Sequence, residues 1–310
     1  MNELPLVSVI MPVYNGAQYV RAAIESVFAQ TYPHIEFIAV DDGSTDDSLD
    51  ILNCYGPRMK VIQQANSGPG AARNNGVQAS TGELLAFIDS DDLWDPTKIE
   101  QQVAILTHYP AAVSVYCETR RINASGNVFQ DTDAYRVAWP SGWVFESLIR
   151  GRGSVCFSPT QVMVTRQAFI RTGGFPVDIH QAEDYELWLR LSLEGPMLYL
   201  VETLSSYRRH PASLSVSEEH EFGRLAAHYR ILDRLAKDAT NDPRIKPLSL
   251  IHAELAECAT ALAYFARKKG DYSRAVEAYQ TALRLKPHAI GLWMRLLVTL
   301  FFRLATTRNQ

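Results

Sequence analysis

Between Val7 and Ile88, short apolar runs rich in β-branched residues alternate with longer segments that have helical spacing. The four runs read VSVIMPV, EFIAV, MKVIQQ and ELLAFI. Strands separated by helices usually pair in parallel, because the connecting segment has room to return to the starting edge of the sheet. The pattern therefore predicts an α/β domain with a mostly parallel central sheet.

Capping and turn residues indicate where the helices begin. Asn15 is expected to cap the first helix, and Thr45 or Asp46 to cap the next one. Pro69 stands near the first position of a third helix, in SGPGAARNNGVQASTG. Further along, AVSVYCETRRI, TQVMVTR and MLYLVETL predict strands, and a helix is expected to open near Ala182.

The composition changes after residue 215, where proline and glycine become sparse. We expect a first domain over residues 1–215 and a small all-α region over residues 216–310. In the second part, GDYSRAVEAYQTALRLKP, residues 270–287, has the spacing of one tetratricopeptide repeat. A single such unit cannot bury its apolar face alone, so it must pack on the first domain, on another chain or on the final helix.

The final helix, AIGLWMRLLVTLFFRLA, is interrupted by Arg295 and Arg303. It falls short of the roughly 20 apolar residues that a membrane span needs. We expect it to pack within the helical region, with contact at a membrane surface or with a protein partner as the alternatives.

Charge and cysteine usage exclude several classes of protein. The formal net charge is -4 and no run of Lys and Arg is dense, which argues against nucleic acid as a partner. The four cysteines form no C-x-x-C pair, so neither a zinc site nor a disulfide framework is expected. The N-terminus lacks a basic flank and its apolar run is broken at Pro12, unlike a secretory signal. The expected location is the cytoplasm, or the inner face of the membrane as a peripheral protein.

Four acidic residues crowd the stretch AFIDSDDLWDP, which follows the fourth predicted strand; they are Asp89, Asp91, Asp92 and Asp95. Like charges about 4 Å apart repel by about 4 kcal/mol at a protein surface, so such a cluster needs a cation or raised pKa values. Mg²⁺ and Mn²⁺ accept paired carboxylates and complete their shells with phosphate and water oxygens. The alternative is an acidic loop that leads into the next helix, for which Asp95 alone would suffice.

Other polar groups end neighbouring strands. Tyr14 and Asn15 follow the first strand, and Asp41 and Asp42 follow the second. Ligands of open parallel sheets bind beyond the carboxyl ends of the strands, where these groups would meet the acidic cluster. The loop SGPGAARNNG matches neither a P-loop nor a Rossmann fingerprint. It is either an ordinary turn or a place where backbone N–H groups and Arg73 hold an anion.

Five segments in this order resemble the family 2 inverting glycosyltransferases: VSVIMPVYNGAQYVRAAIESVFAQTY, FIAVDDGSTDDS, GPGAARNNG, GELLAFIDSDDLWDP and AEDYELWLRL. The resemblance covers about Leu6 to His210. It implies a GT-A-type nucleotide-sugar-binding domain and a nucleoside-diphosphate sugar donor, with UDP as the expected nucleotide. It further implies a divalent metal, Mn or Mg, at the Asp-x-Asp and inversion at the anomeric carbon.

The resemblance assigns the donor side residue by residue. Pro12, Tyr14 and Asn15 match the segment that lines the base and ribose, and Asp42 matches the acid that pairs with the uracil edge. Asp91 matches the direct metal ligand, and Asp89 the residue nearer the ribose or a metal-bound water. Asp92 shares one of these two roles. The alternatives are purely structural roles: Asp41 and Asp42 would be turn formers, and Tyr14 a half-buried aromatic at the end of a strand.

The segment AEDYELWLRL supplies an acidic pair. Asp184 aligns with the general base, which an acceptor hydroxyl needs to become a nucleophile. Glu183 is interpreted as a first-turn acid that suits the helix dipole. In YRRHPASLS, His210 would contact the metal or the diphosphate and Arg208 or Arg209 the diphosphate, unless this strand end is a solvated edge.

These assignments predict an enzyme that moves one sugar from a UDP-sugar to a hydroxyl of a growing or lipid-linked glycan. The Gln-x-x-Arg-Trp motif and membrane spans of processive synthases are missing from this sequence, which favours single addition. Two alternatives stay open: transfer to a polyprenyl phosphate, and a non-catalytic interaction protein that uses its helical tail. The stretch 123–153 would line the acceptor side, and the sequence does not identify the sugar or the acceptor.

Overall fold

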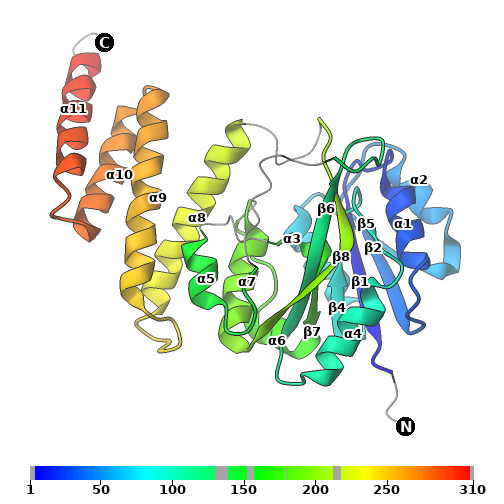
Figure 1. The fold of residues 1–310 in the computed structure, drawn as a ribbon. Coiled ribbons are helices and arrows are strands. Elements are labelled where there is room, and N and C mark those ends of the chain that lie inside the picture. The colour runs from blue at the N-terminus through cyan, green and yellow to red at the C-terminus, as the bar shows by residue number, and fades with distance from the viewer. Residues whose placement is uncertain (1–3, 130–138, 152–156, 180, 212–217, 308–310) are drawn as a thin grey trace. The chain divides into compact units, whose positions relative to one another are not determined.

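The computed structural model describes residues 4–129, 139–151, 157–179, 181–211 and 218–307 (Figure 1). The chain divides into two compact units, one of residues 1–148 with 155–213 and one of residues 149–154 with 214–310. The predicted domain boundary at residue 215 falls among residues 212–217, outside the described part, and stays a prediction.

The strands, in chain order, are β1 (Val7–Val13), β2 (Ile35–Asp41), β3 (Lys60–Gln63), β4 (Leu84–Phe87), β5 (Leu93–Trp94), β6 (Ser114–Ile122), β7 (Val162–Thr165) and β8 (Met197–Arg208). The helices among them are α1 (Val20–Phe28), α2 (Ser48–Asn53), α3 (Pro69–Gln78), α4 (Lys98–His108), α5 (Phe145–Arg150), α6 (Arg166–Thr172) and α7 (Glu183–Glu194), with single turns η1 (Gly56–Arg58) and η2 (Pro159–Gln161).

The described strands form one sheet in the order β3-β2-β1-β4-β7-β6-β8-β5. The first four are parallel, as the alternating pattern predicts, and β6 and β8 also pair in parallel. Strand β7 is antiparallel to both β4 and β6, and β5 is antiparallel to β8. The predicted α/β fold with a mostly parallel sheet is confirmed.

Helices cover both faces of the parallel half, which is why every residue of β1 is buried. Val9 and Met11 belong to a core that includes the apolar faces of α1 and α4. Ile10 faces the opposite way, toward α3. There a Cβ on Gly76 would come within 2.5 Å of Ile10 Cγ2, so α3 lies unusually close to the sheet.

Several predicted caps are wrong. The N-cap of α1 is Tyr19, while Asn15 has a left-handed backbone (φ 49°) and its Oδ1 accepts a hydrogen bond from the Thr45 N–H at 2.8 Å. Thr45 therefore stabilises the loop rather than the helix. Asp46 does accept from the Ser48 N–H at the start of α2 (3.0 Å). Asp95 leads into α4 through its carbonyl, because its carboxylate pairs with Arg120 at 2.6 Å.

The second unit contains α8 (Glu218–Asp238), α9 (Leu248–Lys268), α10 (Tyr272–Leu285) and α11 (Ile290–Thr307), each packed against the next. Its core joins residues of α9, α10 and α11: Ala259, Ala263, Val276, Tyr279, Ala282, Leu283, Leu292 and Leu296. The repeat-like segment thus packs on the final helix, one of the three outcomes expected for it. Its tetratricopeptide character stays a prediction. Within the described part of the chain, no helix is long and apolar enough to cross a membrane.

Candidate active site

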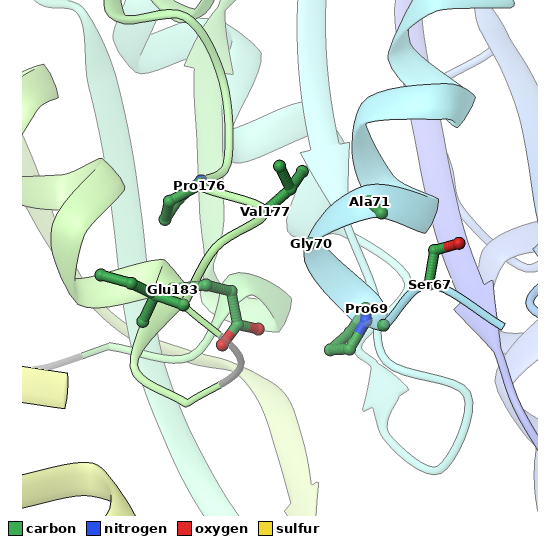
Figure 2. A pocket seen from close by; sticks show the side chains of 9 residues that line it. Ser67, Pro69, Gly70, Ala71, Pro176, Val177 and Glu183 are labelled. Atoms are coloured by element: carbon green, nitrogen blue, oxygen red, sulfur yellow. The ribbon is translucent and has the colours of Figure 1, made fainter. Parts of the chain in front are cut away.

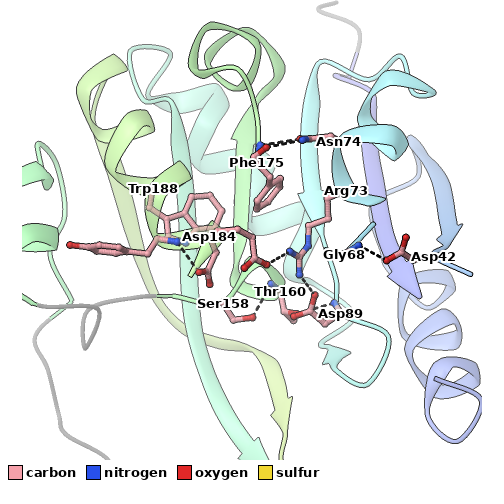
Figure 3. A network of polar contacts seen from close by, with 12 residues as sticks. Asp42, Gly68, Arg73, Asn74, Asp89, Ser158, Thr160, Phe175, Asp184 and Trp188 are labelled. Carbon is pink, nitrogen blue, oxygen red and sulfur yellow. Dashed lines mark hydrogen bonds and ion pairs between the residues drawn. The ribbon is translucent and has the colours of Figure 1, made fainter. Parts of the chain in front are cut away.

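Arg73 joins three parts of the first unit. It lies one turn into α3 and is buried, with Nη2 donating to Asp89 Oδ1 at 2.6 Å and Nη1 donating to Glu183 Oε1 at 3.0 Å (Figure 3). The Phe175 ring lies 5.1 Å from the guanidinium carbon. Burial alone would lower the pKa of Arg73, but the two carboxylates outweigh it and raise the pKa. The cation therefore stays charged and fixes the end of β4 relative to the start of α7.

Asp184 stands beside Glu183 in the first turn of α7 but does not share its partner. Its Oδ1 accepts from the Tyr185 N–H at 2.7 Å. Burial, and next the negative charge of Glu183, raise the pKa of Asp184 to about 7. Ala182, the N-cap residue of α7, has a left-handed backbone (φ 61°), a strained conformation that in non-glycine residues clusters at functional sites. The carboxylate is thus poised to take up a proton near neutral pH.

Glu183 fits its predicted position in the first turn of α7, and the structure adds its ion pair with Arg73. Arg73 itself was expected to hold an anion. The anions that it holds are two protein carboxylates.

Asp91 meets His210 at the end of β8. Asp91 Oδ2 and His210 Nε2 are 3.0 Å apart, and the Tyr19 ring packs on the imidazole with centroids separated by 4.8 Å. Burial and then the charge of Asp89 raise the pKa of Asp91, while His210 opposes the shift. The role expected for His210, contact with the metal or the diphosphate, stays a prediction, and its position beside Asp91 is compatible with that role.

The alternative of a solvated edge is wrong for Arg208, which is only 4% exposed. Its Nε donates to the Asp91 carbonyl at 2.7 Å, and its guanidinium carbon lies 4.8 Å from the centre of the Tyr19 ring. Arg208 thus holds the backbone of the loop that carries Asp91 through a hydrogen bond to the Asp91 carbonyl.

Asp92 is fully buried and both of its oxygens have protein donors. Oδ2 accepts from the Thr160 hydroxyl at 2.6 Å and Oδ1 from the Arg208 N–H at 2.9 Å. The Thr160 oxygen in turn accepts from the Asp89 N–H at 3.1 Å (Figure 3). These contacts give Asp92 a positioning role, in place of the shared ligand role expected for it. Thr160, in η2, carries no motif signal and was missed by sequence reasoning.

The proposed nucleotide side lies at the ends of β1 and β2. Pro12 is buried within β1, whereas Tyr14 is 52% exposed and accessible to a ligand. Asp42 accepts from the backbone N–H groups of Ser67 and Gly68 at 2.8 and 2.9 Å, which fixes the loop before α3 (Figure 3). This is more than a turn-forming role for Asp42.

Asp41 is the last residue of β2 and is also buried. Its Oδ1 has no hydrogen-bond partner among the described residues. A buried acceptor without a donor is costly, so a ligand N–H that reached this oxygen would bind favourably. Sequence reasoning treated Asp41 as a turn former and did not select it.

A shallow pocket with about 10 Å³ of accessible space opens beside this network (Figure 2). The N-terminal end of α3 forms one wall and the segment before α7 the other; the lining residues are Ser67–Ala71, Pro176, Val177, Ile179 and Glu183. Ligand pockets usually measure about 300–1,000 Å³, so the pocket in this conformation has room for about one water-sized group and not for a ligand.

Of the described side chains, Asp91 and His210 come closest to the arrangement that a divalent metal needs. Among the described residues, no group of three or more His, Cys, Asp and Glu side chains is arranged to hold a metal. The 3.0 Å between Asp91 Oδ2 and His210 Nε2 is about the separation of adjacent ligands on an octahedral ion with bonds of about 2.1 Å. Mg²⁺ commonly takes one or two protein carboxylates and fills its shell with substrate phosphates and water. Asp91 and His210 therefore fit such an ion when a diphosphate supplies the remaining ligands.

A family model described as "Glycosyl transferase family 2" matches residues 8–173, more than half of the chain. The chain belongs to glycosyl transferase family 2. The matched residues include Arg73, Asp89 and Asp91, whereas Asp184 and His210 lie beyond them.

Curated relatives agree with this membership. An uncharacterised glycosyltransferase of Rickettsia prowazekii is 29% identical over 92% of this chain and 86% of its own length. The putative teichuronic acid biosynthesis glycosyltransferase TuaG of Bacillus subtilis is 32% identical over 76% of this chain and 91% of its own length. The chondroitin synthase of Escherichia coli is 30% identical over 70% of this chain, a match that spans 31% of that longer protein.

Solved structures share the fold. S. aureus TarS 1-349 in complex with UDP-GlcNAc has a TM-score of 0.66 at 19% identity, over 90% of this chain and 81% of that one. The mannosyltransferase PcManGT from Pyrobaculum calidifontis, in complex with GDP-Man and Mn²⁺, has a TM-score of 0.63 at 19% identity, over 99% of this chain and 88% of that one. The predicted GT-A-type fold followed by C-terminal helices is confirmed.

Proposed function

We propose that this glycosyltransferase moves one sugar, with inversion, from a UDP-sugar to a hydroxyl of a growing glycan in cell-surface polysaccharide or glycoconjugate synthesis. The observation that carries the proposal is the buried Arg73, which holds Asp89 and Glu183 at 2.6 and 3.0 Å and so brings the donor side and the base side together. The names of relatives that make chondroitin and teichuronic acid support a glycan acceptor.

On the acceptor side, Asp184 takes the proton of the attacking hydroxyl. Its pKa of about 7 lets the carboxylate be ionised at physiological pH and still bind a proton as the new bond forms. Glu183 is less available for this role, because its Oε1 is held by Arg73 Nη1 at 3.0 Å. Inversion follows from one direct displacement on the face opposite the leaving diphosphate.

On the donor side, Pro12, Tyr14, Asn15 and Asp42 hold the nucleotide. The exposed Tyr14 ring offers a stacking surface for a base, and Asp42 keeps the loop at residues 67–68 in place beside it. Asp91 and His210 would hold Mn²⁺ or Mg²⁺, with Asp89 adjacent. Such an ion would neutralise the charge that develops on the diphosphate.

The test is substitution of the base. Asp184→Asn keeps the shape of the side chain but removes its proton affinity, so we expect kcat to fall by about 10²- to 10⁴-fold while the Kd for UDP stays unchanged. UDP release from a panel of UDP-sugars with Mn²⁺ measures the first quantity, and calorimetric titration with UDP and Mn²⁺ measures the second. Asp50→Asn, at an exposed position of α2, is the matched control.

Two results would reject parts of the proposal. Full turnover by Asp184→Asn would favour a polyprenyl phosphate acceptor, which is already anionic and needs no base. Absence of both UDP binding and UDP release in the unsubstituted protein would favour an interaction protein over an enzyme.

A further inference from the structure

Helix α11 carries a second surface that the proposed reaction does not use. Residues of this outer face recur at the spacing of one side of a helix and are between 44% and 75% exposed; they are Ile290, Trp293, Met294, Leu297, Val298 and Phe301. The opposite side of α11 packs on α10 through Leu292 and Leu296, which are buried. The six outer residues therefore do not contribute to the hydrophobic core of the second unit.

The outer face is suited to an apolar medium. Trp293 Nε1 donates to the Pro287 carbonyl at 3.0 Å, so the polar atom of the indole already has a partner while the ring is half exposed. Large contiguous apolar patches on a protein surface usually mark an interaction site.

The charge of the surrounding chain indicates what this face contacts. From Ala278 to Gln310 the sequence contains no Asp or Glu, but it contains Arg284, Lys286, Arg295, Arg303 and Arg308. Lys286 is paired with Glu257 of α9, and two of the arginines, Arg295 and Arg303, belong to α11 itself. A helix with a broad apolar face, a tryptophan and only basic charges is typical of segments that lie in the interface of an anionic membrane.

We infer that the outer face of α11 binds the surface of an anionic lipid bilayer, with the six apolar side chains entering the interface. The basic residues of α11, Arg295 at the edge of this face and Arg303 further round the helix, add attraction to the anionic lipids. A second copy of the chain fits less well. Two copies of α11 brought together would add the positive charges of both helices, and α11 offers no acidic residue to offset them. The helix is also not long and apolar enough to cross a membrane, so it lies on the bilayer surface.

The inference is tested by co-sedimentation of the full chain with phosphatidylcholine vesicles that either contain or lack phosphatidylglycerol. We expect binding to the anionic vesicles, and an affinity lower by about 100-fold or more in the double variant Leu297→Glu/Phe301→Glu, because each side chain loses the burial of its apolar surface. Val201→Glu is the control, since Val201 is 70% exposed on β8 of the first unit. Circular dichroism checks that all variants keep their helices.

A second variant separates charge from apolar contact. Arg295→Gln/Arg303→Gln should lower the affinity for the anionic vesicles by about 30-fold, because each basic residue near such a surface contributes about 1 kcal/mol. Its affinity for pure phosphatidylcholine should not change. The assay contains no donor or acceptor sugar, so its result is independent of the proposed reaction.

Three outcomes would overturn the inference. Unsubstituted protein that remains in the supernatant with both kinds of vesicle would contradict it directly. Equal binding by Leu297→Glu/Phe301→Glu would place the contact elsewhere on the chain. A dimer seen by analytical ultracentrifugation and dissolved by that double variant, without vesicle binding, would assign the face to a second copy.

Discussion

Glu183 and Asp184 are adjacent carboxylates with different surroundings. Glu183 is paired with the buried Arg73 at 3.0 Å. Asp184 accepts one backbone hydrogen bond, and the negative charge of Glu183 helps to raise its pKa. Burial and the charge of Glu183 raise the pKa of Asp184 to about 7, which suits a group that takes up a proton during the reaction. The raised pKa of Asp184 should therefore appear in the pH dependence of the reaction rate.

Below pH of about 7 Asp184 is protonated and cannot accept a proton, so kcat/KM should rise with pH through about 7 and level off above it. Glu183→Gln removes the neighbouring charge, which should lower the pKa of Asp184 and move the rising limb to lower pH. The measurement is kcat/KM for UDP release against pH. Glu202→Gln, at an exposed position of β8, is the control, and an unmoved limb in Glu183→Gln would contradict the assignment.

The sequence revealed some of these residues and concealed others. Asp89, Asp91 and Asp184 lie within segments that resemble those of the glycosyltransferase family, so the sequence alone pointed to them. The contacts of Arg73 were hidden, because its partners are 16 and 110 positions away and no local pattern records such a pairing. Thr160 was hidden for the same reason, since it reaches Asp92 across 68 positions.

At the scale of elements, α3 owes its position to a missing side chain. A Cβ on Gly76 would lie 2.5 Å from Ile10 Cγ2 and 3.2 Å from Val40 Cγ2, so the helix packs on the sheet at a distance that only glycine permits. The same helix carries Arg73, one turn earlier. Close packing at Gly76 thus helps to position the Arg73 guanidinium between the carboxylates of Asp89 and Glu183.

Gly76→Ala should lower the free energy of unfolding of the first unit by about 1–3 kcal/mol, because overpacking outweighs the gain in helix propensity. Gly291→Ala in α11 is the matched helical control. Nothing lies within 4 Å of the Cβ that it would add, so its stability should stay equal or rise by up to about 1 kcal/mol. Urea denaturation followed by circular dichroism measures both, and stabilisation by Gly76→Ala would argue against the close packing.

Helices and strands with a strong hydrophobic pattern in the sequence were predicted well. Those without such a pattern were not predicted. Strand β1 was predicted at its observed bounds because VSVIMPV is a continuous apolar run. Strand β5 has only two residues, Leu93 and Trp94, and exists because it pairs with Ser205 and Ser206 of β8. Helix α6 had signals that were overlooked: the Thr165 hydroxyl accepts from the Ala168 N–H at its start, and Gly173 ends it in a left-handed conformation.

At the scale of the whole chain, the two units have separate cores. The sheet core is built from β1, α1, α4 and their neighbours, and the helical core from α9, α10 and α11. The composition change near residue 215 predicts a domain boundary that lies outside the described residues and stays a prediction. It did not anticipate the antiparallel insertion of β7 between β4 and β6, because strand order depends on pairing between distant segments.

Separate cores predict separate responses to ligand and to mutation. UDP with Mn²⁺ at about 100 times its Kd should add about 2.7 kcal/mol to the stability of the first unit, and none to the second. Leu283→Ala in α10 removes a buried side chain and should cost the second unit about 2–5 kcal/mol without changing the affinity for UDP.

Differential scanning calorimetry should therefore show two transitions, one raised by UDP and the other lowered by Leu283→Ala. Leu297→Ala, at an exposed position of the outer face of α11, is the control for the substitution. A single transition that responds to both UDP and Leu283→Ala would show that the two cores unfold as one cooperative unit. In that case the helical region would contribute directly to the stability of the nucleotide-sugar site, and Leu283→Ala should also weaken UDP binding near the transition temperature.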